Sequence, residues 1–551
     1  MHANLAALDV LDACSEQERA ATDAERERLG LWSGWGATAV VFDEDRGEWA
    51  AVREQLRERL GEGGYRAARQ STLNAHYTHP AIAAAMWQVA HQLGYEGGSV
   101  LEPGCGPGVF IGLAPDPALV TGVEIDPSTA AIAEALHPDA VVVNRSFAEF
   151  GRRRDGRFDL VIGNVPFADV RLHDPFHNRG NHSLHNHFLV KSLALTRPGG
   201  LVVALTSRYT MDASNPAARR ELAEFGELLD AIRLPAGAHR RAAGTEAVTD
   251  LLIFRRHPAQ SAEQEPEWIR TRTLALDGGP ARVNAYFVAH PDRVLGELTV
   301  GHGMYGAETL SVRGEHDPEQ LAAQIAAIGD QLADTHPPTT PGRREVSPAA
   351  EPQDRGQVAA APEGLWDGHL LALADGRFAE VQDGGQEPLE VPRSVAGEVR
   401  QLLGLRDQAR RLLSLEAESA RDTPLLDSAR TALRDSYDTY HARYGPINRF
   451  TLRQTGRVNE RSGEPVMARI TPGAQRILRR DPFYPLVCSF RDVRCHHPTG
   501  RAGGAVARAD GAPPRADPRR RRARGRDRGV HGDPRPDRPL RDRPAARTDR
   551  A

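Results

Sequence analysis

Lysine is almost absent from this sequence. Lys191 is the one lysine in 551 residues, and arginine supplies nearly all of the remaining basic charge. A phosphate-binding loop of the GxxxxGK type needs a lysine to reach the phosphates, so this chain does not hydrolyse ATP by that route. The arginine bias, together with abundant Ala, Gly and Pro, indicates a GC-rich coding sequence more than a specialised binding surface.

Cysteines are few, and long apolar runs are lacking. The four cysteines have no CxxC spacing, which argues against a disulfide framework and against a zinc knuckle. No stretch approaches 18 apolar residues, and the N-terminus lacks the basic and apolar regions of a signal peptide. We therefore expect a soluble, cytoplasmic protein with no membrane partner. The cysteines are Cys14, Cys105, Cys488 and Cys495.

Charge is divided unevenly along the chain. Residues 494–551 hold 17 Arg and 7 Asp, which leaves 53 basic against 67 acidic residues in 1–493. An acidic body binds phosphate poorly as a whole, so nucleic-acid binding would have to rest on local arginine patches.

The hydrophobic pattern divides the chain into segments. Between 71 and 257, short apolar runs alternate with helical patterns, which predicts a parallel sheet wrapped by helices. The runs are SVLEPG (99–104), VTGVEID (120–126), AVVVNRS (140–146), FDLVIGN (158–164), GGLVVALTS (199–207) and TDLLIFRR (249–256). The other expected segments are N-terminal helices in 1–70 that end at GEGG, an irregular extension with one short strand (ARVNAYFVAH) in 258–332, a linker in 333–362, and a hairpin followed by helices in 363–493.

Residues 494–551 are rich in Arg, Pro, Ala and Gly, and they have almost no large apolar side chains. Such a composition cannot form a core. Two interpretations stay open for this tail: a disordered basic arm, or the product of a reading-frame shift after about residue 493.

The stretch SVLEPGCGPGVF (99–110) is a strand followed by a glycine-rich loop that opens a helix, which is typical of a nucleotide-cofactor site. Gly104, Gly106 and Gly108 do not fit GxGxxG. Glu102 at the strand end could meet a ligand amino group, and Glu124 ends the next strand, where an acid accepts hydrogen bonds from ribose hydroxyls. These features favour S-adenosylmethionine (SAM) over NAD, and a purely structural glycine turn is the third alternative.

The strand FDLVIGN ends at Asn164 and leads into VPF (165–167). An exocyclic amine such as that of adenine is a poor nucleophile, and an enzyme can activate it by accepting both amino hydrogens and stacking the ring. The Asn164 side-chain oxygen and the Val165 carbonyl are suitable acceptors, and Phe167 offers a stacking face. A base in a duplex cannot reach such a site, so the adenine would be flipped out or single-stranded.

The chain carries LEPGCGPGVF, GVEID, NVPF and RPGGLVVALTS in this order. These stretches resemble the N6-adenine DNA methyltransferases, whose catalytic motif is Asn-Pro-Pro-Phe or Asn-Pro-Pro-Tyr. The order, with the SAM loop before the catalytic motif, is similar to that of type I restriction-modification methylation subunits. The resemblance implies a SAM-dependent methyltransferase fold, a Rossmann-like doubly wound α/β sheet. It places Asn164, Val165, Pro166 and Phe167 in the catalytic motif. It also implies that Tyr77 and Thr78 border the methionine end of SAM and that Phe147, after Ser146, lies against the SAM adenine.

Residues 30–493 resemble more closely the methylase part of large methylase–helicase proteins of plasmids, phages and conjugative elements. The stretches SGWGATAVVF, STLNAHYT, IGNVPFADVRLHDP, AIRLPAGAHRRAAGTEAVTDLLIF and DPFYPLV carry this resemblance. In that family a helicase motor follows, and here the chain turns to arginine-rich sequence instead. The implied partners are DNA and a helicase domain or chain.

One departure from the motif and the chemistry of the site leave alternatives open. Val165 keeps the carbonyl of the motif but lacks the fixed φ of proline, so activity could be low. The site would also suit an RNA base or a protein glutamine amide, and a catalytically weak DNA-binding or anti-restriction module is a third interpretation.

The loop RLHDPFHNRGNHSLHNHF (171–188) holds five histidines without metal-ligand spacing, so we predict no metal there. We expect Arg171 and Arg179 of this loop to lie near phosphates.

Overall fold

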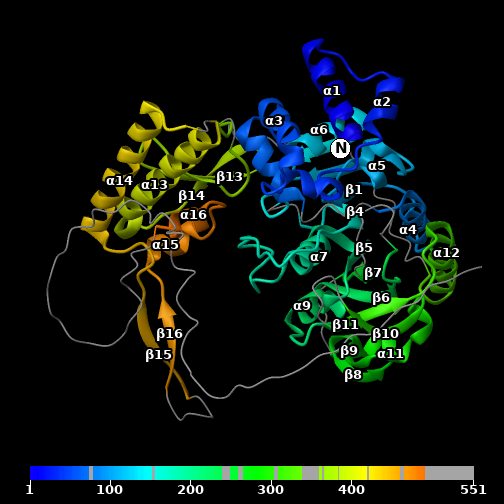
Figure 1. The fold of residues 1–551 in the computed structure, drawn as a ribbon. Coiled ribbons are helices and arrows are strands. Elements are labelled where there is room, and N and C mark those ends of the chain that lie inside the picture. Colours follow the sequence, from blue (N-terminus) through cyan, green and yellow to red (C-terminus); the bar gives the residue numbers. More distant parts are fainter. Residues whose placement is uncertain are drawn as a thin grey trace, which may run out of the picture. The chain divides into compact units, whose positions relative to one another are not determined.

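The computed structural model describes residues 1–72, 78–151, 155–238, 248–258, 265–302, 308–337, 359–362, 365–382, 384–418, 421–458 and 465–490. Its central element is a seven-stranded sheet in the order β3-β2-β1-β4-β5-β7-β6 (Figure 1). The strands are β1 (Val100–Pro103), β2 (Val120–Glu124), β3 (Val141–Asn144), β4 (Phe158–Asn164), β5 (Thr196–Ser207), β6 (Gly226–Arg233) and β7 (Thr249–Arg256). The predicted α/β fold class is confirmed.

Strands β1 to β5 are parallel, as predicted, whereas β7 is antiparallel to both β5 and β6. The prediction of a wholly parallel sheet is therefore wrong at one edge. β7 follows β6 along the chain and pairs with it in the antiparallel direction, as the two strands of a hairpin-like pair do. Strand β6 was not predicted, because the two acids in GELLDAIR interrupt the apolar pattern of a buried strand.

Helices cover both faces of the sheet, and side chains of β4 alternate between the two cores. Leu160 and Ile162 join the core with α4 (Pro80–Gln92) and α12 (Pro318–Thr335), while Val161 joins the core with α7 (Leu184–Leu195). Burial on both faces explains why this strand reads as an almost continuous apolar run. The remaining helices around the sheet are α5 (Val109–Gly112), α6 (Pro127–Leu136), α8 (Tyr209–Asp212) and α9 (Ala217–Phe225).

The N-terminal segment forms α1 (His2–Glu16), α2 (Asp23–Leu29) and α3 (Ala50–Ser71). Helices are found where they were predicted, but α3 does not end at GEGG: it kinks at Gly61, with φ of 65°, and continues to Ser71. Trp32 and Trp35 lie in a core cluster that includes Ile132 of α6, so these helices pack onto the sheet domain.

The extension after β7 is more regular than predicted. It contains two antiparallel pairs and α11 (Ala285–Ala289), and the predicted strand ARVNAYFVAH changes to a helix at Asn284. The Asn284 side chain accepts the Tyr286 N–H and donates to the carbonyl oxygens of Met211 and Trp268, so it ends the strand by capping the helix. The strand pairs are β8 (Thr271–Leu276) with β9 (Gly279–Asn284), and β10 (Glu297–His302) with β11 (Glu308–Arg313).

Residues 365–490 have a hydrophobic core of their own. The predicted hairpin around ADGRF is present, and a third strand extends it. The elements are β12 (Leu370–Ala372), β13 (Phe378–Gln382), β14 (Gly385–Leu389), α13 (Arg393–Glu418), α14 (Pro424–Tyr444), β15 (Thr451–Val458), β16 (Pro465–Ile470), α15 (Gly473–Leu478) and α16 (Tyr484–Cys488). Most of the predicted linker and the whole Arg/Pro-rich tail lie outside the described residues. No helix in the described part of the chain is long and apolar enough to cross a membrane.

Candidate active site

The strands that carry Glu102, Glu124 and Asn164 end at one edge of the sheet. Parallel pairing places Pro103 opposite Val123, Glu124 opposite Asn144, and Asn164 opposite Leu205, so these strand ends share the carboxyl edge. In open α/β sheets, ligands bind outside this edge.

The glycine loop folds back against β2. The N–H groups of Gly104 and Cys105 both donate to the Val123 carbonyl oxygen, at 2.8 and 3.0 Å. Gly104, Gly106 and Gly108 have φ of 73°, 55° and 86°, which is the left-handed region that only glycine adopts readily. The loop therefore brings its backbone close to the strand ends without side chains in the way.

Glu124 is tied to this loop. Its carboxylate oxygens accept the N–H of Gly106 at 3.0 Å and that of Asp126 at 2.8 Å. Burial raises the pKa of Glu124 to about 7, in opposition to these hydrogen bonds. Burial also raises the pKa of Glu102 well above its ordinary value, with Glu124 adding to the effect. Glu102 is buried, Glu124 is partly exposed, and the two acids repel each other, so a cation beside them would stabilise their ionised forms.

Asp126 and Trp35 were not predicted as site residues. Asp126 caps α6, and its Oδ2 also accepts the indole N–H of Trp35 at 3.3 Å, while its own N–H holds Glu124. The N-terminal segment thus reaches Glu124 through one residue, Asp126. The Asp-Pro pair at the start of α6 is a helix-start signal, but no sequence pattern links it to a tryptophan ninety-one positions away.

The tip of β4 lies against the glycine loop. A Cβ built on Gly104 would be 3.5 Å from Cδ of Pro166 and 3.7 Å from a ring carbon of Phe188. Asn164 is the last residue of the strand and is partly buried, as is Phe167. The structure therefore brings together the two motifs that the sequence separates.

Val165 occupies a core position. Its side chain is 1% exposed, and its N–H donates to the Leu205 carbonyl oxygen at 3.0 Å. A proline here could not make this hydrogen bond. Valine at this position therefore adds one backbone hydrogen bond between the end of β4 and β5.

The remaining predicted cofactor residues have different surroundings. Phe147 is buried in the core, where its ring centroid is 4.6 Å from that of Phe188, and Ser146 opens the turn before it. Ile125, directly after Glu124, is 63% exposed and is the apolar side chain that this edge presents beside the acid. Thr78 is buried at the start of α4, while Tyr77 lies outside the described residues. An exposed isoleucine next to an acid gives no signal in the sequence.

Three histidines of the loop after Asn164 contact carboxylates. His182 Nε2 lies 2.6 Å from Glu221 Oε2, and His177 and His187 both contact Asp174. Within the described ranges, no group of three or more His, Cys, Asp or Glu is arranged to hold a metal ion. Arg171 and Arg179 are exposed, which leaves them accessible to phosphates.

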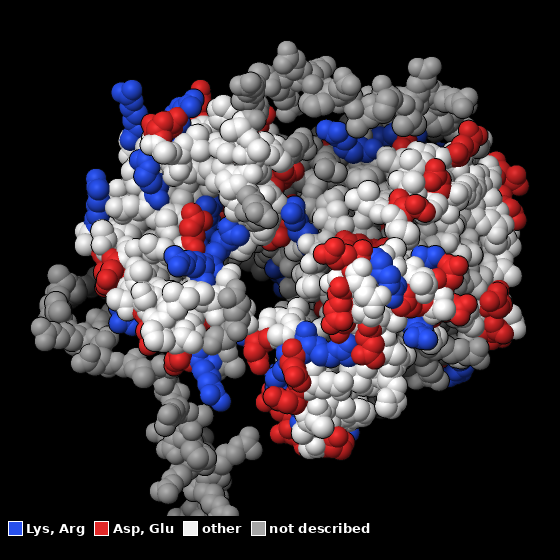
Figure 2. All heavy atoms as spheres, turned by 90° about the horizontal axis from the view of Figure 1, so that it is seen from above, with Lys and Arg blue, Asp and Glu red and all other residues white. Residues whose placement is uncertain are grey.

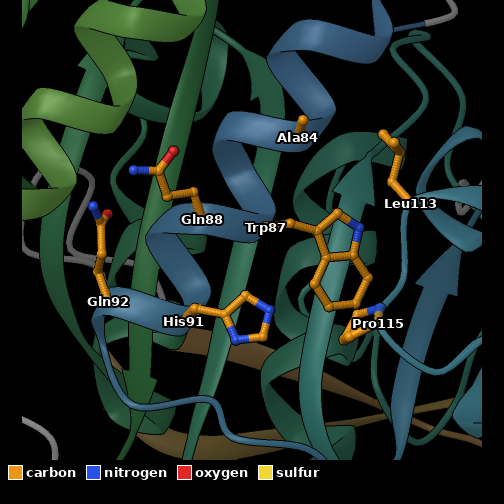
Figure 3. A pocket seen from close by; sticks show the side chains of 7 residues that line it. All are labelled: Ala84, Trp87, Gln88, His91, Gln92, Leu113 and Pro115. Carbon is orange, nitrogen blue, oxygen red and sulfur yellow. The ribbon is translucent and has the colours of Figure 1, made fainter.

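Two surface features lie apart from these motifs. A hollow of about 400 Å³ opens on the outer face of α4 (Figure 3), and its lining includes no residue of the glycine loop or the β4 tip. Figure 2 shows acidic and basic side chains intermingled over the described surface that it presents. The hollow is lined mainly by Trp87, Gln88, His91, Gln92, Leu113 and Pro115.

Comparison with known proteins gives one related sequence. The chain is 26% identical over 378 residues to the "Defense against restriction protein B" of Escherichia phage P1. The match covers 67% of this chain but 16% of the phage protein, so the chain spans about a sixth of its relative. No protein-family profile matches the chain.

Solved structures resemble the chain at low similarity. A protein from Listeria monocytogenes assigned to the class I SAM-dependent methyltransferases is 15% identical, with a TM-score of 0.31 over 48% of this chain and 90% of that one. A modification subunit assigned to a type I restriction enzyme from Vibrio vulnificus is 16% identical, with a TM-score of 0.29 over 49% of this chain and 66% of that one.

Proposed function

We propose that the chain is a SAM-dependent methyltransferase that methylates the N6 amine of adenine in DNA. The observation that carries the proposal is the contact of the glycine loop with the β4 tip, in which Pro166 lies beside Gly104. A group held by the loop and a group held by Asn164 would therefore be neighbours. Methyl transfer needs this arrangement, because donor and acceptor must be held in line at short range.

The residues at this edge fit SAM. Glu102 Oε2 and Thr78 Oγ1 are buried and have no hydrogen-bond partner among the described residues, which costs free energy unless a ligand satisfies them. Glu124 offers two oxygens to ribose hydroxyls, and Ile125 offers an apolar face to a flat ring. When bound, SAM would supply a methyl group activated by its sulfonium charge. The positive charge of SAM would in turn favour the ionised forms of Glu102 and Glu124.

The β4 tip fits an amine acceptor. The Asn164 amide oxygen and the Val165 carbonyl would accept the two amino hydrogens, which localises the nitrogen lone pair, and Phe167 would stack on the base. These groups stand at a strand end, so a duplex base would have to leave its stack to reach them. An RNA base or a glutamine amide presents the same NH2 group and is the competing substrate.

DNA is the substrate that the resemblance to restriction-modification proteins supports. The phage relative is named for defense against restriction, and the chain matches a sixth of its length. The sequence resemblance to methylase–helicase proteins is what supports a helicase part and a mobile element as the proposed context. Val165 in place of proline favours a second candidate function, a weakly active DNA-binding module that serves in anti-restriction.

The test uses the full chain with labelled SAM and, separately, unmethylated plasmid, RNA and protein. We expect label in DNA at adenine N6, mapped by single-molecule sequencing. Asn164→Ala should lose about 100-fold or more of this activity while SAM affinity, measured by calorimetry, is unchanged. Label in protein alone would contradict the DNA substrate, SAM binding without transfer would favour the DNA-binding module, and absence of SAM binding would refute both the cofactor and the reaction.

A further inference from the structure

Lys191, the one lysine of the chain, is fully buried on α7. Its Nζ lies 2.8 Å from Asp174 Oδ2 and donates to the Ala148 carbonyl oxygen at 3.2 Å. The same ammonium is 5.1 Å from the centre of the Phe147 ring. Lys191 therefore contacts two segments at once: the turn after β3, which is predicted to border the cofactor, and the loop after the β4 tip.

Asp174 is the anchor of that loop. Its Oδ1 accepts the N–H groups of Phe176 and His177, each at 3.1 Å, and its Oδ2 lies 3.1 Å from His187 Nε2. Its side chain is completely buried, like that of Lys191. Burial alone would raise the pKa of Asp174, but Lys191 and the two histidines outweigh it and hold the pKa well below its ordinary value.

A buried ion pair is a poor device for stability alone. The desolvation of the two charges offsets most of their attraction, so an apolar side chain of similar volume would serve the core equally well. An ion pair instead fixes the relative position of the groups that it joins. Moving the partners apart would leave two buried, unpaired charges, which is costly in free energy. Here it joins the two segments that flank the proposed site.

We propose that Lys191 is a positioning residue that holds the turn containing Phe147 and the loop containing Asp174 in the relative position that methyl transfer requires. The inference rests on the proposed function. It assigns to Lys191 no contact with either substrate. Its effect should appear in turnover more than in overall folding, because the ammonium sets the spacing between cofactor side and target side.

The charges around Asp174 give a test that separates positioning from packing. The groups that face it are Lys191 and His187 on α7 and His177 in its own loop; His177 in turn contacts Asp155 at 2.8 Å, and Arg256 acts electrostatically on Asp155. Burial lowers the pKa of His187, and Lys191 lowers it further by repulsion. Without Lys191, protonation of His187 at lower pH would return a cation to Asp174.

The first experiment compares kcat/KM of Lys191→Met with the unmodified chain across pH. We expect a large loss near pH 8.5 that shrinks by about tenfold or more near pH 6.5, since the charged fraction of His187 rises up to tenfold per pH unit. Lys191→Met with Asp174→Asn removes the unpaired charge but also the bridge, so stability to urea should return while kcat/KM stays low at every pH. His182→Gln, which removes a histidine–carboxylate pair in the same loop away from Lys191, is the matched control and should show no rescue.

Failure of these outcomes has distinct meanings. A loss in Lys191→Met that is independent of pH, or full kcat/KM in the double variant, would overturn the positioning role. Absence of methyl transfer in the unmodified chain would count against the proposed function and not against this inference, because a second measurement needs no turnover.

That measurement uses Lys191 as the one lysine amine in the unmodified chain. Reductive methylation with labelled formaldehyde modifies Lys191 and the N-terminus, which mass spectrometry of peptides distinguishes. We expect S-adenosylhomocysteine and an adenine-containing oligonucleotide each to slow labelling of Lys191 by about threefold or more, as binding on either side holds the bridge closed. Labelling rates that neither compound changes, although both bind, would refute the bridge.

Discussion

Glu124→Gln should remove a pH-dependent loss of stability while it weakens SAM binding. The folded-state pKa of Glu124 is about 7, against 4.5 for an ordinary glutamate. Because the folded-state pKa is the higher one, the proton's contribution to stability is fully present below about pH 4.5 and is lost as the pH rises to about 7. At 1.36 kcal/mol per pKa unit, this loss is about 3 kcal/mol, and a glutamine does not undergo it.

The assay is urea unfolding of both proteins from about pH 4.5 to 8, followed by circular dichroism. The free energy of unfolding of the variant, relative to the unmodified chain, should rise by about 3 kcal/mol across this range. SAM affinity at pH 8, measured by calorimetry, should fall about 10- to 100-fold, because charge-assisted hydrogen bonds to the ribose contribute about 1.5–3 kcal/mol. Glu134→Gln, an exposed glutamate on α6, is the matched control and should change neither quantity.

Parallel pH profiles for the variant and the unmodified chain would refute the protonated state of Glu124. Unchanged SAM affinity in the variant would show that Glu124 does not hold the ribose. The two outcomes are independent, so the electrostatics of the site and its ligand are tested separately.

Three further changes test the geometry of the site. Val165→Pro removes the hydrogen bond to the Leu205 carbonyl, so urea unfolding should show a loss of about 1 kcal/mol, and a gain in methylation despite that loss would show that valine weakens the motif. Gly104→Ala places a Cβ at φ of 73° beside Pro166; thermal unfolding should show a cost of about 1–3 kcal/mol, and no cost would contradict the left-handed loop. Trp35→Phe removes the hydrogen bond to Asp126, and calorimetry should show SAM affinity about threefold lower, whereas an unchanged affinity would separate the N-terminal segment from the site.

Local sequence patterns determined the strands of the central sheet. The apolar runs that end in Glu124 and Asn164 are buried on both faces, and such runs are readable without any partner. The strand β6 was missed because Asp230 is buried within it, where it accepts the Tyr286 hydroxyl and contacts Arg293. Those partners belong to the extension and lie more than fifty residues further along the chain, so the sequence around Asp230 does not predict them.

The glycine loop and Asn164 were likewise recognisable from the sequence, because their chemistry depends on residue type at a strand end. What only the tertiary structure decided is which groups surround them: the Trp35–Asp126–Glu124 hydrogen bonds, the burial of Phe147, and the bridge that Lys191 forms to Asp174. Hydrogen bonds, desolvation and ion pairs depend on distance in space, and chain folding brings together residues whose separation along the sequence carries no such information. The amino-acid order therefore determined the elements and the motif residues, and three-dimensional packing determined their charge states and their neighbours.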